Sequence, residues 1–263
     1  MIRTHGIAAM VSQNRMTITN RTLMPDEWQL RRDICEIGRR MHERGLVAGT
    51  DGNISARLSG ERVLITPSGA CLGLLQPGDL AIIDSTGAGL PGHAKPSSER
   101  WMHLMAYAQR PDIAAAIHAH PPVTIALTVA GVAMPQCGLP EVILAFGRVP
   151  VTSYATPATE EGAAVIRDPI KTYDALVLDR HGSLTVGKGV YDALFKLEKL
   201  EHGALVMYLA HQLGGAKDLP PEEVAKLAAL REQFGLGRAS DVAAECIPPG
   251  TVIPRIPRGP DAY

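Results

Sequence analysis

The sequence predicts an α/β domain in which short strands alternate with helices. Apolar residues recur at helical spacing in several long stretches, and short runs of β-branched and aliphatic residues indicate strands. Turns rich in glycine or proline separate the two kinds of segment. With 263 residues, of which 46% are apolar and 20% charged, the chain is long enough for one large domain with a substantial core.

The domain is predicted over residues 25–236, between a flexible leader (1–24) and a proline-rich C-terminal extension (237–263). The first 20 residues contain two arginines and no acidic residue, so a transit peptide is the alternative to a flexible leader. Neither end is expected to contribute to the core.

The first half of the domain begins with a helix over 25–46, in which Trp28, Ile34, Ile37 and Met41 recur near helical spacing. Short strands follow, and each ends at a turn rich in glycine, proline or serine. These strands are expected over 54–58, 63–66 and 80–84, and the next helix runs from about 97 to about 109.

The second half begins with a strand over 114–120, and two prolines then start a short helix over 123–130. Pro150 lies in the next strand, 149–152, which is therefore expected at a sheet edge, because proline cannot donate a hydrogen bond to a neighbouring strand. The remaining elements are a helix over 159–166, strands over 175–178 and 184–186, and helices over 190–213 and 220–234.

Composition narrows the range of partners. A net charge of -1 provides no field that would gather nucleic acid or an anionic membrane, and no apolar run approaches the roughly 20 residues of a membrane span. The four cysteines are far apart and form no Cys-x-x-Cys, so they predict neither a disulfide framework nor a zinc ribbon. We therefore expect a cytoplasmic protein.

Two histidines one residue apart, His118 and His120, end an apolar run. Side chains alternate between the two faces of a strand, so both imidazoles are expected to point the same way while Ile117 and Ala119 face the core. The two prolines that follow stop the strand and place the histidines at its exit. Two converging imidazoles are typical of a zinc site, although such a pair alone is more often explained by surface or packing histidines.

Other polar residues have both a structural and a functional interpretation. His181, between a buried strand and Gly182, is a candidate third ligand or a hydrogen-bonded turn residue. Glu99 either complements the dipole of its helix or, beside a metal, binds the ion and then moves a proton. Ser97 and Ser98 are N-cap candidates, or form a phosphate nest of hydroxyl and N–H groups with loops 50–53 and 68–69.

Five motifs, in order and spacing, resemble those of the class II aldolase/adducin family. They are Gly49-Thr-Asp-Gly-Asn-Ile-Ser, Ile65-Thr-Pro-Ser-Gly69, Lys95-Pro-Ser-Ser-Glu99, His118-Ala-His120 and His181-Gly182. The similarity spans about residues 25–236. It implies a three-layer fold, with a central, mostly antiparallel sheet flanked by helices on both faces. It also implies a homotetramer with active sites at the subunit interfaces.

The resemblance further implies a site on this chain. Zinc, or another divalent ion such as Mn²⁺, Co²⁺ or Fe²⁺, would bind His118, His120 and His181, with Glu99 as a further ligand and as the acid/base. A substrate phosphate would be held by Thr50, Gly52, Asn53, Ser68, Gly69, Ser97 and Ser98. These expectations lead to a zinc-dependent aldolase that cleaves a phosphorylated ketose, similar to fuculose 1-phosphate, to dihydroxyacetone phosphate and an aldehyde.

Other functions stay open. Aldolases of this family that act on fuculose phosphate carry a tyrosine shortly after the histidine helix, and residues 134–140 here contain none. The alternative is a metal-dependent decarboxylase of a hydroxylated aromatic or sugar acid, and an epimerase or dehydratase is a third possibility. A non-catalytic scaffold, as in the adducins, is disfavoured because the three histidines and Glu99 are present. Lys95 suits Schiff-base chemistry, but is more simply a charge partner of the phosphate.

Overall fold

The computed structural model describes residues 26–59, 61–132, 134 and 136–246. Its centre is a seven-stranded sheet with strand order β3-β2-β1-β4-β7-β6-β5. All neighbouring strands are antiparallel except β5 and β6, which are parallel. The strands are β1 (Asn53–Arg57), β2 (Val63–Ile65), β3 (Ala81–Ile83), β4 (Ala115–Ala119), β5 (Val151–Thr152), β6 (Ala175–Leu178) and β7 (Gly182–Gly187). The mostly antiparallel sheet is thus confirmed.

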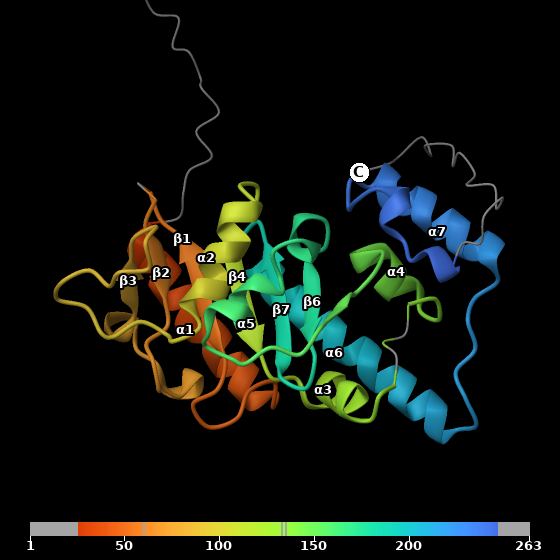
Figure 1. Ribbon diagram of the computed structural model, residues 1–263, viewed down its shortest axis with the longest axis horizontal. Helices are drawn as coiled ribbons and strands as arrows, with labels where there is room; N and C mark the ends of the chain where they lie inside the picture. The colour runs from red at the N-terminus through yellow and green to blue at the C-terminus, as the bar shows by residue number, and fades with distance from the viewer. Residues whose placement is uncertain (1–25, 60, 133, 135, 247–263) are drawn as a thin grey trace, which may run out of the picture.

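Helices cover both faces of this sheet, which confirms the three-layer architecture (Figure 1). On one face, α1 (Glu27–Glu43) and the first turns of α6 (Val190–Gln212) pack against Ile54, Ile117 and Ala119. On the other face, α2 (Arg100–Gln109) packs against Ala116 and Leu184. Consecutive residues of β4 therefore serve different layers, as the alternation of side chains along a strand requires.

Shorter elements complete these layers. α3 (Pro122–Val129) follows β4, and α5 (Glu160–Ala164) lies beside α2. Short 3₁₀ helices lie at Leu72–Leu74, Pro77–Asp79, Pro169–Lys171, Ala239–Asp241 and Ala244–Cys246. β5 is an edge strand, as the proline before it predicted. In the described part of the chain, no helix is both long and apolar enough to cross a membrane.

The end of the molecule away from β3 is built by α4 (Pro140–Phe146) and α7 (Pro221–Gln233) (Figure 1). The sequence indicated no element over α4. Ala239, Val242 and Ala243 pack into the same apolar cluster as these helices. Packing therefore continues ten residues past the predicted domain end at residue 236, because these apolar side chains cover the interface between α4 and α7. The leader (1–24) and residues 247–263 of the extension lie outside the described residues.

The cysteine interpretation needs a correction. Cys137 and Cys246 are joined in a disulfide with sulfur atoms 2.06 Å apart, although 109 residues separate them in the sequence. Both are buried in the α4–α7 cluster, where the fold brings the two segments together. Cys35 and Cys71 are free thiols. The cytoplasmic location, which was inferred in part from the cysteine spacing, stays a prediction.

Candidate metal centre and adjoining pockets

β4 positions the first two histidines. His118 pairs with Asn53 of β1 on one side and with Leu184 of β7 on the other, and it is fully buried. His120 follows the end of the strand, and its Nε2 lies 3.0 Å from Nε2 of His118. The prediction that the two imidazoles point the same way is confirmed.

His181 comes from the turn between β6 and β7. The residue before it, Arg180, has φ +54°, and the Arg180 N–H donates to Oγ1 of Thr128 in α3 at 3.1 Å. Gly182 is required by a close approach: a Cβ there would lie 2.4 Å from the Ala119 carbonyl oxygen. The glycine thus lets β7 approach β4, and this approach brings His181 to His118. From the sequence, Gly182 had been expected to allow a tight turn after His181.

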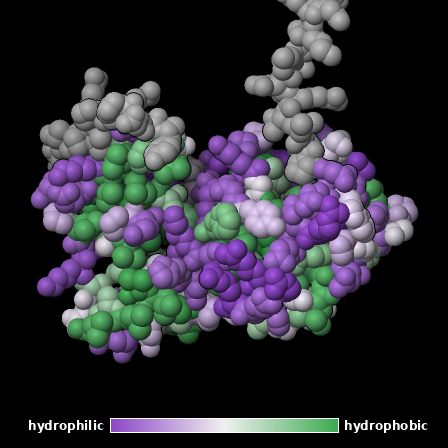
Figure 2. Space-filling view, turned by 180° about the vertical axis from the view of Figure 1, so that it is seen from behind, coloured by the Kyte–Doolittle hydropathy of each residue, from purple (hydrophilic) through white to green (hydrophobic). Residues whose placement is uncertain are grey.

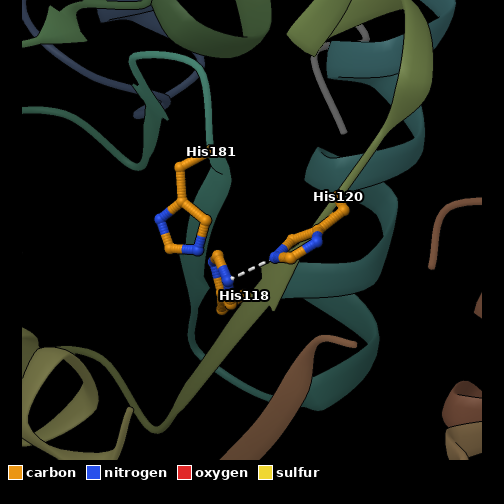
Figure 3. Close-up of side chains that lie close together, drawn as sticks. All are labelled: His118, His120 and His181. Atoms are coloured by element: carbon orange, nitrogen blue, oxygen red, sulfur yellow. Dashed lines mark hydrogen bonds between the residues drawn. The ribbon is translucent and has the colours of Figure 1, made fainter. Parts of the chain in front are cut away.

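The three histidines form one cluster (Figure 3). One nitrogen from each ring can be chosen so that all three atoms lie within 4.8 Å of one another. His118 and His120 approach from the end of β4, and His181 approaches from the β6–β7 turn.

Hydrogen bonds set the state of the rings. Nδ1–H of His118 donates to the carbonyl oxygen of Ser183 at 2.9 Å, so Nε2 of a neutral His118 carries a lone pair. Nδ1 of His120 faces Asp51 at 3.4 Å, which favours a lone pair on its Nε2 as well. Burial, followed by the neighbouring His118, lowers the pKa of His120 and lowers that of His181 to about 4. His120 and His181 are therefore neutral near neutral pH.

This arrangement fits a bound cation. The two Nε2 atoms lie 3.0 Å apart, which is a hydrogen-bond distance when one of them carries a hydrogen (Figure 3). A cation can take the place of that hydrogen when both atoms carry lone pairs. In tetrahedral zinc sites with Zn–N bonds of about 2.0–2.1 Å, two ligand nitrogens lie roughly 3.3 Å apart. The spacing and chemistry of the donors therefore match a metal site.

Glu99 lies against this cluster. It occupies the N-cap position of α2 without making a side-chain cap hydrogen bond. Its Oε2 is 3.0 Å from Nε2 of His118, its Oε1 is 3.4 Å from Nε2 of His181, and Asn53 donates from Nδ2 to Oε2 at 3.0 Å. Burial alone would raise the pKa of Glu99. A hydrogen bond from Nε2 of His118, when that atom carries a hydrogen and no cation is bound, and the hydrogen bond from Asn53 outweigh burial and hold the pKa well below its usual range. The carboxylate thus serves the cluster rather than the helix end.

The residues predicted to hold phosphate gather in one pocket of about 140 Å³ beside the histidines. All seven line it: Thr50, Gly52, Asn53, Ser68, Gly69, Ser97 and Ser98. Gly52 and Gly69 have φ +77° and +71°, a region that favours glycine. Asp51, Glu99 and His120 also line the pocket, which therefore adjoins the histidine cluster directly.

Two of the predicted nest residues also have structural roles. Ser97 is buried, and its Oγ accepts the N–H of Glu99 at 3.2 Å. The N–H of Ser68 donates to the carbonyl of Lys95 at 2.9 Å. The Lys95 side chain is exposed, and Lys95 is not among the lining residues, so its expected role as the charge partner of a phosphate finds no support.

Comparison with known proteins agrees with these features. The family model for the class II aldolase and adducin N-terminal domain matches residues 32–208. The chain belongs to the class II aldolase and adducin family.

Relatives in this family carry more than one activity. The chain is 35% identical over 185 residues to a 3-oxo-tetronate 4-phosphate decarboxylase of Cupriavidus necator, covering 69% of this chain and 84% of the relative. It is 30% identical to an L-fuculose phosphate aldolase of Methanocaldococcus jannaschii, covering 68% of this chain and 96% of the relative. Among solved structures, YgbL of Klebsiella pneumoniae, a putative aldolase/epimerase/decarboxylase, superposes with a TM-score of 0.71 at 30% identity, covering 76% of this chain and 98% of that one.

A second pocket of this class II aldolase family member also adjoins the histidine cluster. It is a slot of about 20 Å³ between α2, α5 and the β6–β7 turn, and Glu99 and His181 line it. Its wall also includes Trp101, Thr152, Ser153, Thr159 and Asp179. No local sequence signal predicted this slot, because its wall comes from segments that meet only in the fold.

His103 was not predicted from the sequence as a site residue, and it is fully buried behind Asn53. One signal was present: Glu99 and His103 are four residues apart at the start of a helix, and this spacing places both on one face. The ring of His103 hydrogen-bonds to the Asn53 amide and to the hydroxyl of Ser55.

Proposed function

We propose that the protein is a divalent-metal-dependent carbon–carbon lyase that acts on a small phosphorylated molecule. The observation that carries the proposal is the position of Glu99, whose two oxygens lie 3.0 Å from His118 and 3.4 Å from His181. Glu99 also lines both the hydroxyl-rich pocket and the narrow slot. A proton carrier, a metal site and a phosphate-sized pocket thus lie within reach of one small substrate.

The hydroxyl-rich pocket is the proposed phosphate site. No lysine or arginine is among the described residues that line it, so hydroxyl groups and N–H groups of the nest would hold the phosphate. One amide hydrogen of Asn53 is used by Glu99, and the second is available to a phosphate oxygen. This site anchors one end of the substrate and places its carbon chain beside Glu99.

The proposed ligands of the ion are His118, His120 and His181, with Glu99 as a further ligand before substrate binds. Zinc is proposed because three imidazoles form one of its common catalytic ligand sets, and Mn²⁺, Co²⁺ and Fe²⁺ are the alternatives. When bound, the ion supplies positive charge for the enolate oxygen that forms as a carbon–carbon bond breaks.

Decarboxylation of a phosphorylated 3-oxo acid is the reaction that these residues fit best. The C1–C2 bond breaks, its electron pair becomes the enolate, carbon dioxide leaves, and one proton is added to C2. Glu99 would carry that proton from solvent to C2 after substrate has displaced its carboxylate from the histidines, because its pKa is held low mainly by that contact. One acid/base group then suffices.

Aldol cleavage of a phosphorylated ketose is the second candidate, supported by the likeness to fuculose phosphate aldolases. It needs an acid for the aldehyde oxygen in addition to Glu99. No tyrosine is among the described residues that line either pocket. Aldol cleavage therefore ranks second.

The test supplies metal-loaded protein with 3-oxo-tetronate 4-phosphate and, separately, with L-fuculose 1-phosphate. Release of carbon dioxide from the first, abolished by EDTA and restored by zinc, is the expected result. If L-fuculose 1-phosphate yields dihydroxyacetone phosphate while 3-oxo-tetronate 4-phosphate releases no carbon dioxide, the protein is an aldolase instead. Absence of both products with every metal tried would contradict both reactions.

A homotetramer with active sites at the subunit interfaces is the proposed assembly. α6 exposes Tyr191, Phe195, Leu205 and Leu209, whose spacing places them on one side of the helix. The space-filling view shows apolar surface gathered at the end of the molecule where α6 and α7 lie (Figure 2). Light scattering should give four times the chain mass, and a monomer at micromolar concentration would refute the assembly.

A further inference from the structure

A buried row of polar side chains leads from Glu99 into the interface between the sheet and α2. Asn53 donates to Glu99 at 3.0 Å, and its Oδ1 contacts Nε2 of His103. Nδ1 of His103 lies 2.6 Å from Oγ of Ser55, which in turn lies 2.8 Å from the hydroxyl of Tyr107. Asn53, Ser55, His103 and Tyr107 are all buried.

Two periodicities place these groups in register. Asn53 and Ser55 are two residues apart on β1 and therefore share a face of the sheet. Glu99, His103 and Tyr107 are four residues apart and therefore share a face of α2. Where the two faces meet, residues from the strand and the helix alternate along one hydrogen-bonded row.

The direction of every hydrogen bond in the row follows from the carboxylate at its end. An ionised Glu99 only accepts, so Asn53 turns its NH₂ group toward Glu99 and its Oδ1 toward His103. Oδ1 only accepts, so Nε2 of His103 must carry a hydrogen. Burial lowers the pKa of His103 to about 3, so the ring is neutral and Nδ1 accepts. Ser55 then donates to Nδ1, and Tyr107 donates to Ser55.

The far end of the row is anchored. Burial raises the pKa of Tyr107, so its hydroxyl keeps the hydrogen that Ser55 needs. The guanidinium of Arg57 lies 4.6 Å from the centroid of the Tyr107 ring and donates to the carbonyl of Ile113 at 2.9 Å. Tyr107 is therefore held both by its ring and by its hydroxyl.

We infer that His103 is a positioning residue: its Nε2–H sets the orientation of the Asn53 amide, which in turn holds the Glu99 carboxylate against the histidine cluster. The inference rests on the proposed role of Glu99 as the proton carrier. Without the Nε2–H, the Asn53 amide loses the donor that fixes its oxygen. It can then turn Oδ1 toward Glu99, where two acceptors repel.

Two variants of similar size separate positioning from packing. In His103→Gln, the side-chain nitrogen extends about as far as Nε2 of histidine, so the hydrogen bond to Asn53 can persist while that to Ser55 is lost. In His103→Asn, the side chain reaches only the position of Nδ1, so Ser55 keeps a partner while Asn53 loses its donor. Each variant therefore loses one of two buried hydrogen bonds.

Turnover should distinguish the two variants. We expect His103→Gln to stay within about threefold of the wild-type kcat and His103→Asn to fall by roughly 10- to 100-fold, because displacement of a reacting group by about 1 Å costs this much. Bound metal should stay near wild type in both. KM should stay near wild type in His103→Gln and rise in His103→Asn, because a turned Asn53 amide also loses its hydrogen toward the proposed phosphate. Thr185→Val is the matched control, because it removes a buried hydroxyl bond to Ala193 on the other face of the sheet. Its kcat should be unchanged.

A second readout needs no substrate. In ¹⁵N-histidine-labelled protein, His103 should show a protonated Nε2 and an unprotonated Nδ1. The Asn53 side-chain amide should have one slowly exchanging hydrogen, which persists in His103→Gln and is lost in His103→Asn. A protonated Nδ1 in the wild type, or equal kcat values for the two variants, would overturn the inference. If the protein catalyses neither proposed reaction, the proposed function fails while these resonances still decide the role of His103.

Discussion

Asn53 lies directly opposite His118 where β1 pairs with β4. Directly opposed residues of antiparallel strands point to the same face, so the Asn53 amide and the His118 imidazole both reach Oε2 of Glu99, each at 3.0 Å. The position of the carboxylate therefore depends on one strand register. A slip of one residue would turn Asn53 to the opposite face and leave Glu99 without its donor.

Each histidine of the cluster should be needed for metal binding. His120→Ala or His181→Ala is expected to lose most of the bound metal, because two imidazoles remain where a catalytic zinc site needs three protein ligands. Both variants should stay folded, since these side chains lie at the end of a strand and in a turn. Elemental analysis of protein purified without chelator measures the loss. His42→Ala, which changes an exposed histidine on α1, should keep its metal. If either cluster variant kept its full content of bound metal, the replaced histidine would not be a metal ligand.

Glu99→Gln tests the proton carrier. Turnover should fall by roughly 10²- to 10⁴-fold, as expected on loss of a general acid/base, while metal stays bound to the three histidines. The variant should also stop exchanging the C–H proton of the substrate with solvent.

Glu141→Gln is the matched control for Glu99→Gln, because Glu141 is an exposed acid in the first turn of α4. Because Glu141 interacts only with the helix dipole, its replacement should lower the free energy of unfolding by about 0.3 to 1 kcal/mol and leave turnover unchanged. Near-normal proton exchange in Glu99→Gln would show that another group carries the proton.

Gly182→Ala should disturb the metal centre. The added Cβ would lie 2.4 Å from the Ala119 carbonyl oxygen, so β7 must move away from β4 or the backbone must absorb the strain. Either response should lower the free energy of unfolding by about 1–3 kcal/mol. Because His181 is the adjacent residue, metal affinity should fall along with the melting temperature. Gly78→Ala, where nothing lies within 4 Å of the added atom and φ is not positive, should change neither. If Gly182→Ala bound metal as tightly as the wild type, β4 and β7 would tolerate the contact between the added Cβ and the Ala119 carbonyl oxygen.

The buried His103 should make the metal-free protein sensitive to acid. Its pKa of about 3 lies below the value of about 6.5 in an unfolded chain, so below pH 6.5 the unfolded chain binds a proton that the folded protein does not. Stability from this residue is therefore full above pH 6.5 and is lost as pH falls toward 3. At about pH 4.5 the loss is on the order of 3 kcal/mol.

Urea unfolding in EDTA at about pH 7.5 and about pH 4.5 measures this loss. His103→Gln has no titrating group at this position, so its stability should fall less between the two conditions, by about the same 3 kcal/mol. Equal pH dependence in the two proteins would contradict a neutral, buried His103.

Much of the site could be predicted from residues close together in sequence. The alternation along residues 114–120 was enough to aim His118 and His120 in one direction, because strand geometry is local. The seven nest residues were identified through motifs whose order and spacing resemble one family, and they line one pocket. Pro150 indicated an edge strand, because a missing donor excludes the interior of a sheet.

Other features were decided by tertiary structure alone. Asn53 and His103 are 50 residues apart, and Cys137 and Cys246 are 109 residues apart. The need for glycine at 182 comes from a carbonyl of another strand. The periodicity of an element shows which face a residue occupies, but a hydrogen bond, a disulfide or a close backbone contact depends on which second element covers that face. That partner is chosen by the packing of the whole core, so it leaves no mark in either segment on its own.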